Sequence, residues 1–297
     1  MNNLKIVLRI LFTIILFIVA DLLIFNTLFA GMQKYYGLNK KSKILCVGHS
    51  HTVLGIDSEK MEKKLNVPVS KYAIAGANTM DRYYMIKHYL SINPDVETII
   101  YDVDTRLFDS EGLSSASYSL FFPFIKNLEM REYLKSQASS EEFFVSQYIK
   151  TARFRDQTLN ISLRGLLNKI ESKKTTKINL NNYKQSLEGE SKNRVKINSY
   201  SIDYLNKTIE YLLSKEKRII LVNLPVIDLL NKIDVGNQKK AKEIFQSMSK
   251  KKNVYFFDYA DEYDNKHELF FDLRHLNEQG KQLITDRLIK DLKAING

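Results

Sequence analysis

The stretch that decides the fold is KILCVGHSHT, residues 43–52. Its first half, Lys43–Gly48, is an apolar run with the length of a buried strand. The glycine and the polar residues after it indicate a tight turn that leads into a helix. A buried strand that turns directly into a helix is the first half of an α/β unit, and the rest of the chain is expected to repeat that unit.

Four further runs have this character and alternate with periodic stretches that predict helices. The predicted strands are Ser70–Ala75, Glu97–Val103, Arg218–Asn223 and Asn253–Asp258. The predicted helices are Asp57–Leu65, Thr79–Ile92, Ile202–Lys215, Asn237–Lys250 and Asn277–Ile295. Such alternation is typical of a parallel sheet covered on both faces. We therefore predict an α/β three-layer sandwich with a five-stranded parallel, flavodoxin-like sheet.

The alternation breaks between the third and fourth predicted strands, over about residues 109–201. Residues 122–134 and 143–154 read as aromatic-rich helices, and residues 169–194 are polar and lysine-rich. A stretch of this length inside a compact domain indicates an insertion, and insertions after strands often form a lid or a substrate wall. For residues 170–195, a loosely held surface excursion is an equal alternative.

Composition excludes several classes of protein. Of the 297 residues, 44% are hydrophobic and 27% are charged, which excludes wholesale disorder, a fibrous repeat and a polytopic membrane protein. The single cysteine, Cys46, excludes an intrachain disulfide and a thiolate zinc cluster, and we expect it to be buried. The net charge of +11 indicates a solvated surface or one held near anionic lipid or wall polymer. Nucleic acid is not expected as a partner, because no basic recognition helix is present.

The N-terminus predicts a membrane anchor. Residues 10–30 read ILFTIILFIVADLLIFNTLFA, and ~20 helical residues span a hydrocarbon core of ~30 Å. No signal-peptidase site follows, so we expect an uncleaved anchor that crosses the lipid bilayer. The expected organisation is a cytoplasmic tail at 1–9, the anchor at 10–31, a linker at 32–42 and one domain over 43–297.

Two features of this anchor leave alternatives. A short tail before a first span predicts a single-pass protein of the cell membrane with its domain on the outer face. The basic residues after the span outnumber those before it, which favours a cytoplasmic domain. Asp21 lies near the middle of the apolar stretch, where a lone carboxyl costs about 2.5–3.5 kcal/mol. It is either protonated or snorkelling, or it contacts another membrane protein.

Reactive side chains follow the predicted strands. Ligands of parallel sheets bind beyond the carboxyl ends of the strands, where Ser50 stands on the turn after the first strand. A serine hydroxyl needs a neighbouring base, and His275 can serve, with Asp272 fixing its tautomer. We predict that these three residues form a catalytic triad. A serine that only caps a helix is the alternative.

The strand-end Gly48-His49-Ser50 block and the Asp272-x-x-His275 block before the last helix resemble the SGNH (GDSL-like) hydrolase superfamily. The resemblance implies that Ser50 is the nucleophile and that the amide of Gly76 is an oxyanion donor. Two blocks depart from the family pattern. His49 stands where the family has aspartate, and Asp102-Val103-Asp104-Thr105 replaces its Gly-x-Asn-Asp block. Asn78 is then the first choice for the missing oxyanion asparagine.

With the anchor added, the chain looks similar to membrane-anchored D-alanyl transfer proteins and to O-acetyltransferase partners of exopolysaccharide export. This likeness implies an envelope polysaccharide or acylated glycan as substrate and a polytopic membrane-bound O-acyltransferase as partner. The expected function is a serine esterase or O-acyltransferase that works through an acyl-Ser50 intermediate and requires no cofactor.

Two other functions stay open. One is a non-catalytic glycan-binding scaffold, favoured by the altered third block. The other is a metal hydrolase, in which His49 and His51 bind zinc together with Asp272 and His275. In the favoured interpretation no metal is bound, His49 packs behind the turn and His51 lines the mouth of the site.

Overall fold

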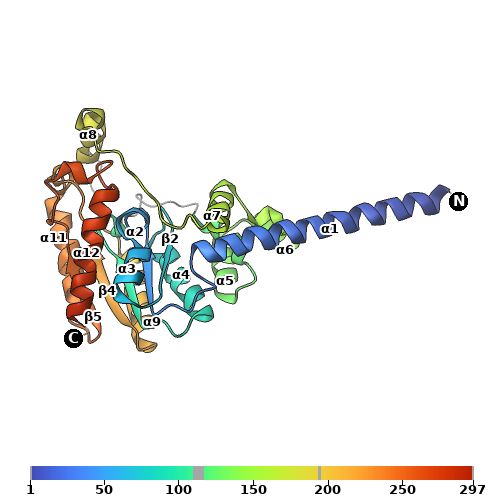
Figure 1. The fold of residues 1–297 in the computed structure, drawn as a ribbon, viewed down its shortest axis with the longest axis horizontal. Helices are drawn as coiled ribbons and strands as arrows, with labels where there is room; N and C mark the ends of the chain where they lie inside the picture. The colour runs from blue at the N-terminus through green and yellow to red at the C-terminus, as the bar shows by residue number, and fades with distance from the viewer. Residues whose placement is uncertain (1, 110–116, 193–194, 296–297) are drawn as a thin grey trace. The chain divides into compact units, whose positions relative to one another are not determined.

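The computed structural model describes residues 2–109, 117–192 and 195–295, and Figure 1 shows the path of the chain. Contacts divide the chain into two compact units. The first combines Met1–Tyr35 with Ala116–Ile170, and the second combines Tyr36–Ser115 with Glu171–Gly297. The region predicted as one insertion is therefore shared between the two units. Its residues 110–116 and 193–194 lie outside the described residues.

Among the described residues, the second unit holds one parallel sheet of five strands in the order β2-β1-β3-β4-β5. The strands are β1 (Ile44–Gly48), β2 (Val69–Ala73), β3 (Thr98–Asp102), β4 (Arg218–Asn223) and β5 (Val254–Asp258). Every strand ends within two residues of its predicted bounds, and the flavodoxin-like sheet is confirmed. The strand order reverses at β1, so the gap between the carboxyl ends of β1 and β3 is the expected ligand site.

Helices cover both faces of this sheet, so the predicted three layers are confirmed. On the face of Cys46 and Ile220, α12 packs against α2 and α3. On the opposite face, α4 packs against α9, and Phe245 of α11 contacts Phe256 of β5 at 5.7 Å between ring centroids. These helices are α2 (Ser50–Gly55), α3 (Ser58–Leu65), α4 (Thr79–Ile92), α9 (Ser199–Ser214), α11 (Val235–Met248) and α12 (Glu278–Ala294). Shorter elements of the unit are η1 (Thr105–Phe108), η4 (Leu180–Tyr183), α8 (Lys184–Lys192), α10 (Asp228–Asn231) and η5 (His267–Leu269).

Cys46 is buried in β1, as predicted. Burial raises the pKa of its thiol to about 12, so the thiolate form is suppressed. The cysteine is a core residue without redox or nucleophilic character.

The first unit is built on α1 (Asn2–Tyr35), the long blue helix of Figure 1. Its residues Asn3–Tyr35 are long and apolar enough to cross a membrane. The other elements of this unit are η2 (Ser117–Phe124), α5 (Leu128–Gln137), α6 (Ser140–Tyr148), η3 (Thr151–Arg153) and α7 (Asp156–Leu166). The helix α7 packs on α1 where two glycines meet, because a Cβ on Gly165 would lie 1.8 Å from the carbonyl oxygen of Gly31.

Neither expectation for Asp21 included a partner in its own chain. Its carboxylate accepts hydrogen bonds from the backbone N–H of Lys150 (2.9 Å) and of Thr151 (2.7 Å). The Thr151 hydroxyl donates a third at 2.6 Å. The carboxylate therefore serves as a cap for η3 and fixes that turn to α1.

We expect His88 to make the second unit sensitive to acid. Burial lowers the pKa of this α4 side chain to about 3, far below the ~6.5 of an unfolded histidine. As pH falls below about 6.5, the unfolded chain binds the proton first, so the free energy of unfolding drops by ~1.4 kcal/mol per pH unit. Urea unfolding of the full chain in detergent at pH 7 and pH 5 checks this. His88→Gln should remove about 2 kcal/mol of the difference between the two pH values, and an unchanged difference would contradict the assignment.

Candidate active site

The structure brings the three residues of the predicted triad into one hydrogen-bonded chain. Ser50 is the first residue of α2, and its Oγ lies 2.8 Å from Nε2 of His275. The Nδ1 atom of His275 lies 2.9 Å from Oδ2 of Asp272. A carboxylate only accepts, so Nδ1 carries the proton and the bare Nε2 faces the serine hydroxyl. This is the tautomer that a general base requires. The catalytic role of the three residues stays a prediction.

A tight loop between η5 and α12 holds the base and the acid. The Oδ1 atom of Asp272 accepts the backbone N–H groups of Arg274 and His275, both at 2.8 Å. The Phe271 ring stacks on the imidazole at 5.6 Å between centroids. Burial alone would raise the pKa of Asp272, but the hydrogen bond and charge of His275, with the two N–H groups, lower it below its ordinary value. The carboxylate is therefore ionised at neutral pH.

The turn that presents Ser50 depends on a glycine and on Asp102 of β3. The Oδ2 atom of Asp102 accepts the Thr52 hydroxyl at 3.0 Å and lies 3.4 Å from the backbone nitrogen of His49. A Cβ at Gly48 would lie 2.0 Å from Thr52 Oγ1 and 2.6 Å from the Cβ of Asp102. Only glycine leaves room for β1 and the start of α2 to approach β3 this closely.

The two departures from the family pattern contact each other. Nδ1 of His49 accepts the backbone N–H of His51 at 3.0 Å, so it is unprotonated and Nε2 carries the proton. Nε2 then donates to Oδ2 of Asp104 at 3.1 Å. The buried histidine of the serine block and the half-buried aspartate of the third block therefore form one pair behind the nucleophile. As expected, His49 packs behind the turn.

The expectation that His51 lines the mouth of the site is wrong. Its side chain is buried, with its ring 4.5 Å from that of His49 and 5.4 Å from that of His275. Burial lowers the pKa of His51 to about 3, so the ring is neutral. Ser50 before it is half-buried, so within the first turn of α2 the side chain of His51 is the more deeply buried of the two.

A metal could bind beside the triad, but with a different ligand set from the one predicted. The ligand atoms of His49, His51 and Asp102 all lie within 4.8 Å of one another. Asp272 and His275, expected as the remaining ligands, are instead engaged with each other and with Ser50. Both ring nitrogens of His49 already have hydrogen-bond partners, which a metal would have to displace.

The predicted oxyanion residues lie on the turn after β2. Gly76 has φ +83°, a left-handed conformation that favours glycine. The Asn78 side-chain oxygen accepts the backbone N–H of Asp81 at 2.9 Å in a capping box of α4, which leaves its amide NH₂ as the group able to donate. The roles of Gly76 and Asn78 as oxyanion donors stay predictions.

Sequence reasoning missed Arg82, which fixes this turn. Its buried guanidinium donates to the carbonyl of Ala77 (3.0 Å) and to that of Asp102 (2.6 Å). It therefore connects the ends of β2 and β3. The only signal in the sequence is an arginine in a helix whose neighbours Met85, Ile86 and Tyr89 are apolar.

Residues 171–178 follow the first unit and lie beside the loop at 270–275 that holds Asp272 and His275. We call these residues the wall and that loop the triad loop. The buried Glu171 carboxylate pairs with Lys71 at 2.6 Å and accepts the Ser58 hydroxyl at 2.7 Å. Further along, the backbone N–H of Ile178 donates to the carbonyl of Phe270 at 2.8 Å. The Nζ atom of Lys174 lies 5.2 Å from the centroid of the Phe271 ring. These contacts hold residues 171–178 in place, and their role as a substrate wall stays a prediction.

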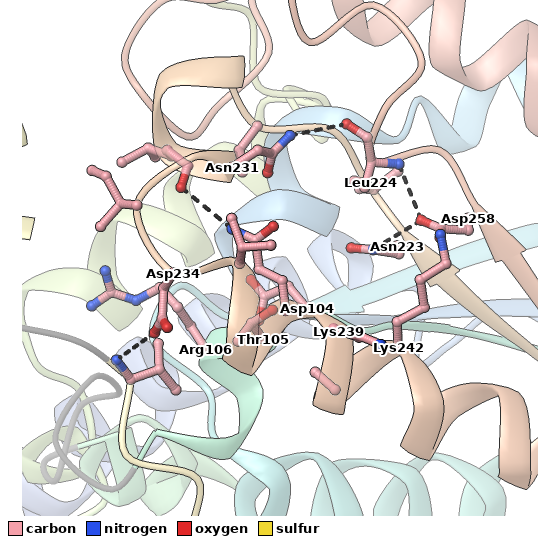
Figure 2. A pocket seen from close by; sticks show the side chains of 18 of the residues that line it. Asp104, Thr105, Arg106, Asn223, Leu224, Asn231, Asp234, Lys239, Lys242 and Asp258 are labelled. Atoms are coloured by element: carbon pink, nitrogen blue, oxygen red, sulfur yellow. Dashed lines mark hydrogen bonds and ion pairs between the residues drawn. The ribbon is translucent and has the colours of Figure 1, made fainter. Parts of the chain in front are cut away.

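A pocket of about 280 Å³ opens at the carboxyl ends of β3, β4 and β5. Figure 2 shows Asn223 and Asp258 together at the ends of β4 and β5, joined by a hydrogen bond of 2.9 Å, with Lys242 beside them. Asp104 and Arg274 also line the pocket, and these residues neighbour His49 and His275 respectively. None of Ser50, Asp272 and His275 lines this pocket, and Arg274, between Asp272 and His275 in the chain, is the part of its lining that belongs to the triad loop. Its lining combines polar groups with apolar side chains such as Leu224 and Val226.

Comparisons with known proteins give structural likeness alone. No protein-family model and no curated protein sequence matches this chain. Similar solved structures include a lipase/acylhydrolase from Enterococcus faecalis, with 11% identity, TM-score 0.45, and 85% of this chain and 96% of that chain covered. An acetyl xylan esterase, AlAXEase, has 12% identity, TM-score 0.45, and 84% and 98% covered. A G-D-S-L family lipolytic protein from Veillonella parvula has 16% identity, TM-score 0.43, and 83% and 96% covered. At these identities and TM-scores, the likeness assigns neither a family nor an activity to this chain.

We expect Gly48→Ala to lower both stability and any activity of the site. The added methyl group would displace Thr52 from Asp102 and shift Ser50, because neither neighbour can move away within the packed turn. Overpacking of this kind costs ~1–3 kcal/mol, measured as a change in urea midpoint. Gly55→Ala is the matched control, since its Cβ would meet only the ends of Leu224 and Leu276. Equal effects of the two variants would contradict the close approach at Gly48.

Proposed function

We propose that this protein is a membrane-anchored serine esterase or O-acyltransferase that works through an acyl-Ser50 intermediate. The observation that carries the proposal is the 2.8 Å contact between Ser50 Oγ and the unprotonated Nε2 of His275, with Asp272 behind the ring. The two side chains lie 225 positions apart in the sequence. Their alignment supports a nucleophile and its base, and a helix-capping serine would not need it.

The proposed reaction has two halves. Ser50 Oγ attacks the ester carbonyl while its proton passes to His275 Nε2, and the carbonyl electron pair moves onto oxygen. The donor groups near Gly76 and Asn78 would stabilise that oxyanion. When the intermediate collapses, the bond to the alcohol breaks and His275 returns the proton to the alcohol. Water or a sugar hydroxyl then attacks the acyl-serine by the reverse route. Water gives an esterase, and a sugar hydroxyl gives a transferase.

A sugar hydroxyl on an envelope polysaccharide is the substrate group that we favour. The pocket at the carboxyl ends of β3, β4 and β5 carries amide, carboxylate and ammonium groups, which suit the hydroxyl groups of a sugar unit. The wall at residues 171–178 borders the triad loop, as a surface for an extended chain would. The anchor favours a cell-envelope substrate, an outer-face location for the second unit and a polytopic membrane-bound O-acyltransferase as partner.

A serine-directed fluorophosphonate probe tests the proposal on the full chain in detergent. We expect labelling of the wild type and of His267→Ala, a matched histidine control, and none of Ser50→Ala or His275→Ala. Asp272→Asn should lower the rate by about 10⁴-fold, because the wrong tautomer of His275 would be stabilised. An unlabelled but folded wild type would favour the non-catalytic glycan-binding scaffold.

The cluster of His49, His51 and Asp102 favours a metal hydrolase as the second candidate. In that case a metal ion would polarise the ester carbonyl or a bound water, and Ser50 would be dispensable. Hydrolysis of an acetyl ester, measured after dialysis against a chelator, separates the candidates. We expect full activity in the dialysed wild type and none in Ser50→Ala. Activity that is lost on dialysis and restored by zinc would support the metal hydrolase instead.

A further inference from the structure

The helix α1 has two parts with different surroundings. Residues 3–20 are exposed on every side, whereas Asp21 and Phe25 are buried and contact Thr151 and Phe154 of the first unit. A helix face that is apolar and bare all round suits lipid, and a face that is covered by protein does not need it. From Asp21 onward one face of the helix is covered by protein, while Leu23 and Ile24 on its other face stay exposed.

Charged groups gather on α1 at this change. The carboxylate of Asp21 binds the backbone of Lys150 and Thr151. The charged ends of Lys150 and Arg153 lie 5.7 and 5.1 Å from the centroid of the Phe25 ring. A cluster of ionised groups is costly in hydrocarbon but suits the headgroup region. This cluster favours a boundary of the hydrocarbon core just before Asp21, whereas the sequence predicts an anchor that continues to residue 31.

The length of the bare part agrees with this boundary. Seventeen residues from Leu4 to Ala20 rise about 26 Å at ~1.5 Å each, close to the ~30 Å of a hydrocarbon core. Lys5 and Arg9 are among the first six of these seventeen residues, at the end away from Asp21, and their long basic side chains reach the headgroups by snorkelling.

The helix α6 ends beside Asp21 and exposes an apolar face. Phe144 and Tyr148 are 62% and 70% exposed, and their rings lie 4.8 Å apart. Val145 and Ile149 extend the same face, while Ser146 on the opposite side is buried. Aromatic rings, tyrosine above all, favour the boundary between headgroups and acyl chains. Thr151, only three residues after Tyr148, is bonded to Asp21, which keeps this face near the proposed boundary.

We propose that the exposed face of α6, formed by Phe144, Val145, Tyr148 and Ile149, inserts into the surface of the bilayer that α1 crosses. Through its hydrogen bonds to Lys150 and Thr151, Asp21 holds this face against the anchor at the level of the headgroups. The inference rests on the anchoring part of the proposed function and commits to lipid as the occupant of the face. Continuity with the bare, apolar part of α1 favours lipid over a second protein.

Tryptophan fluorescence tests the proposal, because the chain contains no tryptophan and each introduced one reports alone. The full chain is reconstituted in vesicles whose lipids carry bromine either near the headgroup or near the chain end. We expect Trp emission of Tyr148→Trp to be quenched mainly by bromine near the headgroup. Ile15→Trp, within the bare part of α1, should be quenched mainly by bromine near the chain end.

Leu163→Trp is the control that decides the level of the boundary. Leu163 is an exposed apolar residue of α7 next to Ser162, which packs at Gly31, ten residues or about 15 Å beyond Asp21 along α1. We expect no quenching there. Water-like emission without quenching in Tyr148→Trp would overturn the proposal, and so would equal quenching in Leu163→Trp. Absence of quenching in Ile15→Trp would instead refute the membrane anchor itself.

Discussion

The hydrogen bond between the Ser50 hydroxyl and the His275 imidazole is the contact on which the candidate site depends. Each partner is fixed by a separate local structure. Asp102 and the absence of a side chain at Gly48 hold the serine turn, and a loop closed by Asp272 holds the imidazole. The parallel sheet brings the two together, since the carboxyl end of β1 and the loop before α12 lie at one edge.

His49 and Asp104 are two residues at which the chain departs from the SGNH pattern that its sequence resembles, and they contact each other. Without Asp104, the buried Nε2 of His49 would lose its hydrogen-bond partner. Together they satisfy each other at 3.1 Å. The third block therefore supports the nucleophile from behind, and the oxyanion donors would come from the turn that Arg82 holds. Because burial lowers the pKa of His51, its ring is neutral and contributes no positive charge to the site.

The sequence predicted what short-range patterns determine. Buried apolar runs located every strand within two residues, and the spacing of Asp272 and His275 allowed a contact within one loop. Contacts between distant residues were not predictable in this way. Arg82 and Asp102 lie far apart in the sequence, and so do Asp21 and Thr151. No short-range pattern links either pair, so neither hydrogen bond was predicted. The sequence predicts one insertion over residues 109–201. Composition does not reveal that this stretch is divided between two units, with changes at residues 116 and 171.

The buried carboxylate of Glu171 stands at the residue where the chain returns to the second unit. Its bonds to Lys71 and Ser58 fix the starting point of the wall independently of the path taken before it. Changes in the length of the preceding segment can therefore be absorbed ahead of this residue without altering the alignment of the wall with the triad loop. The segment before Glu171 and the segment after it are therefore under separate structural constraints, and only the second one is tied to the triad loop.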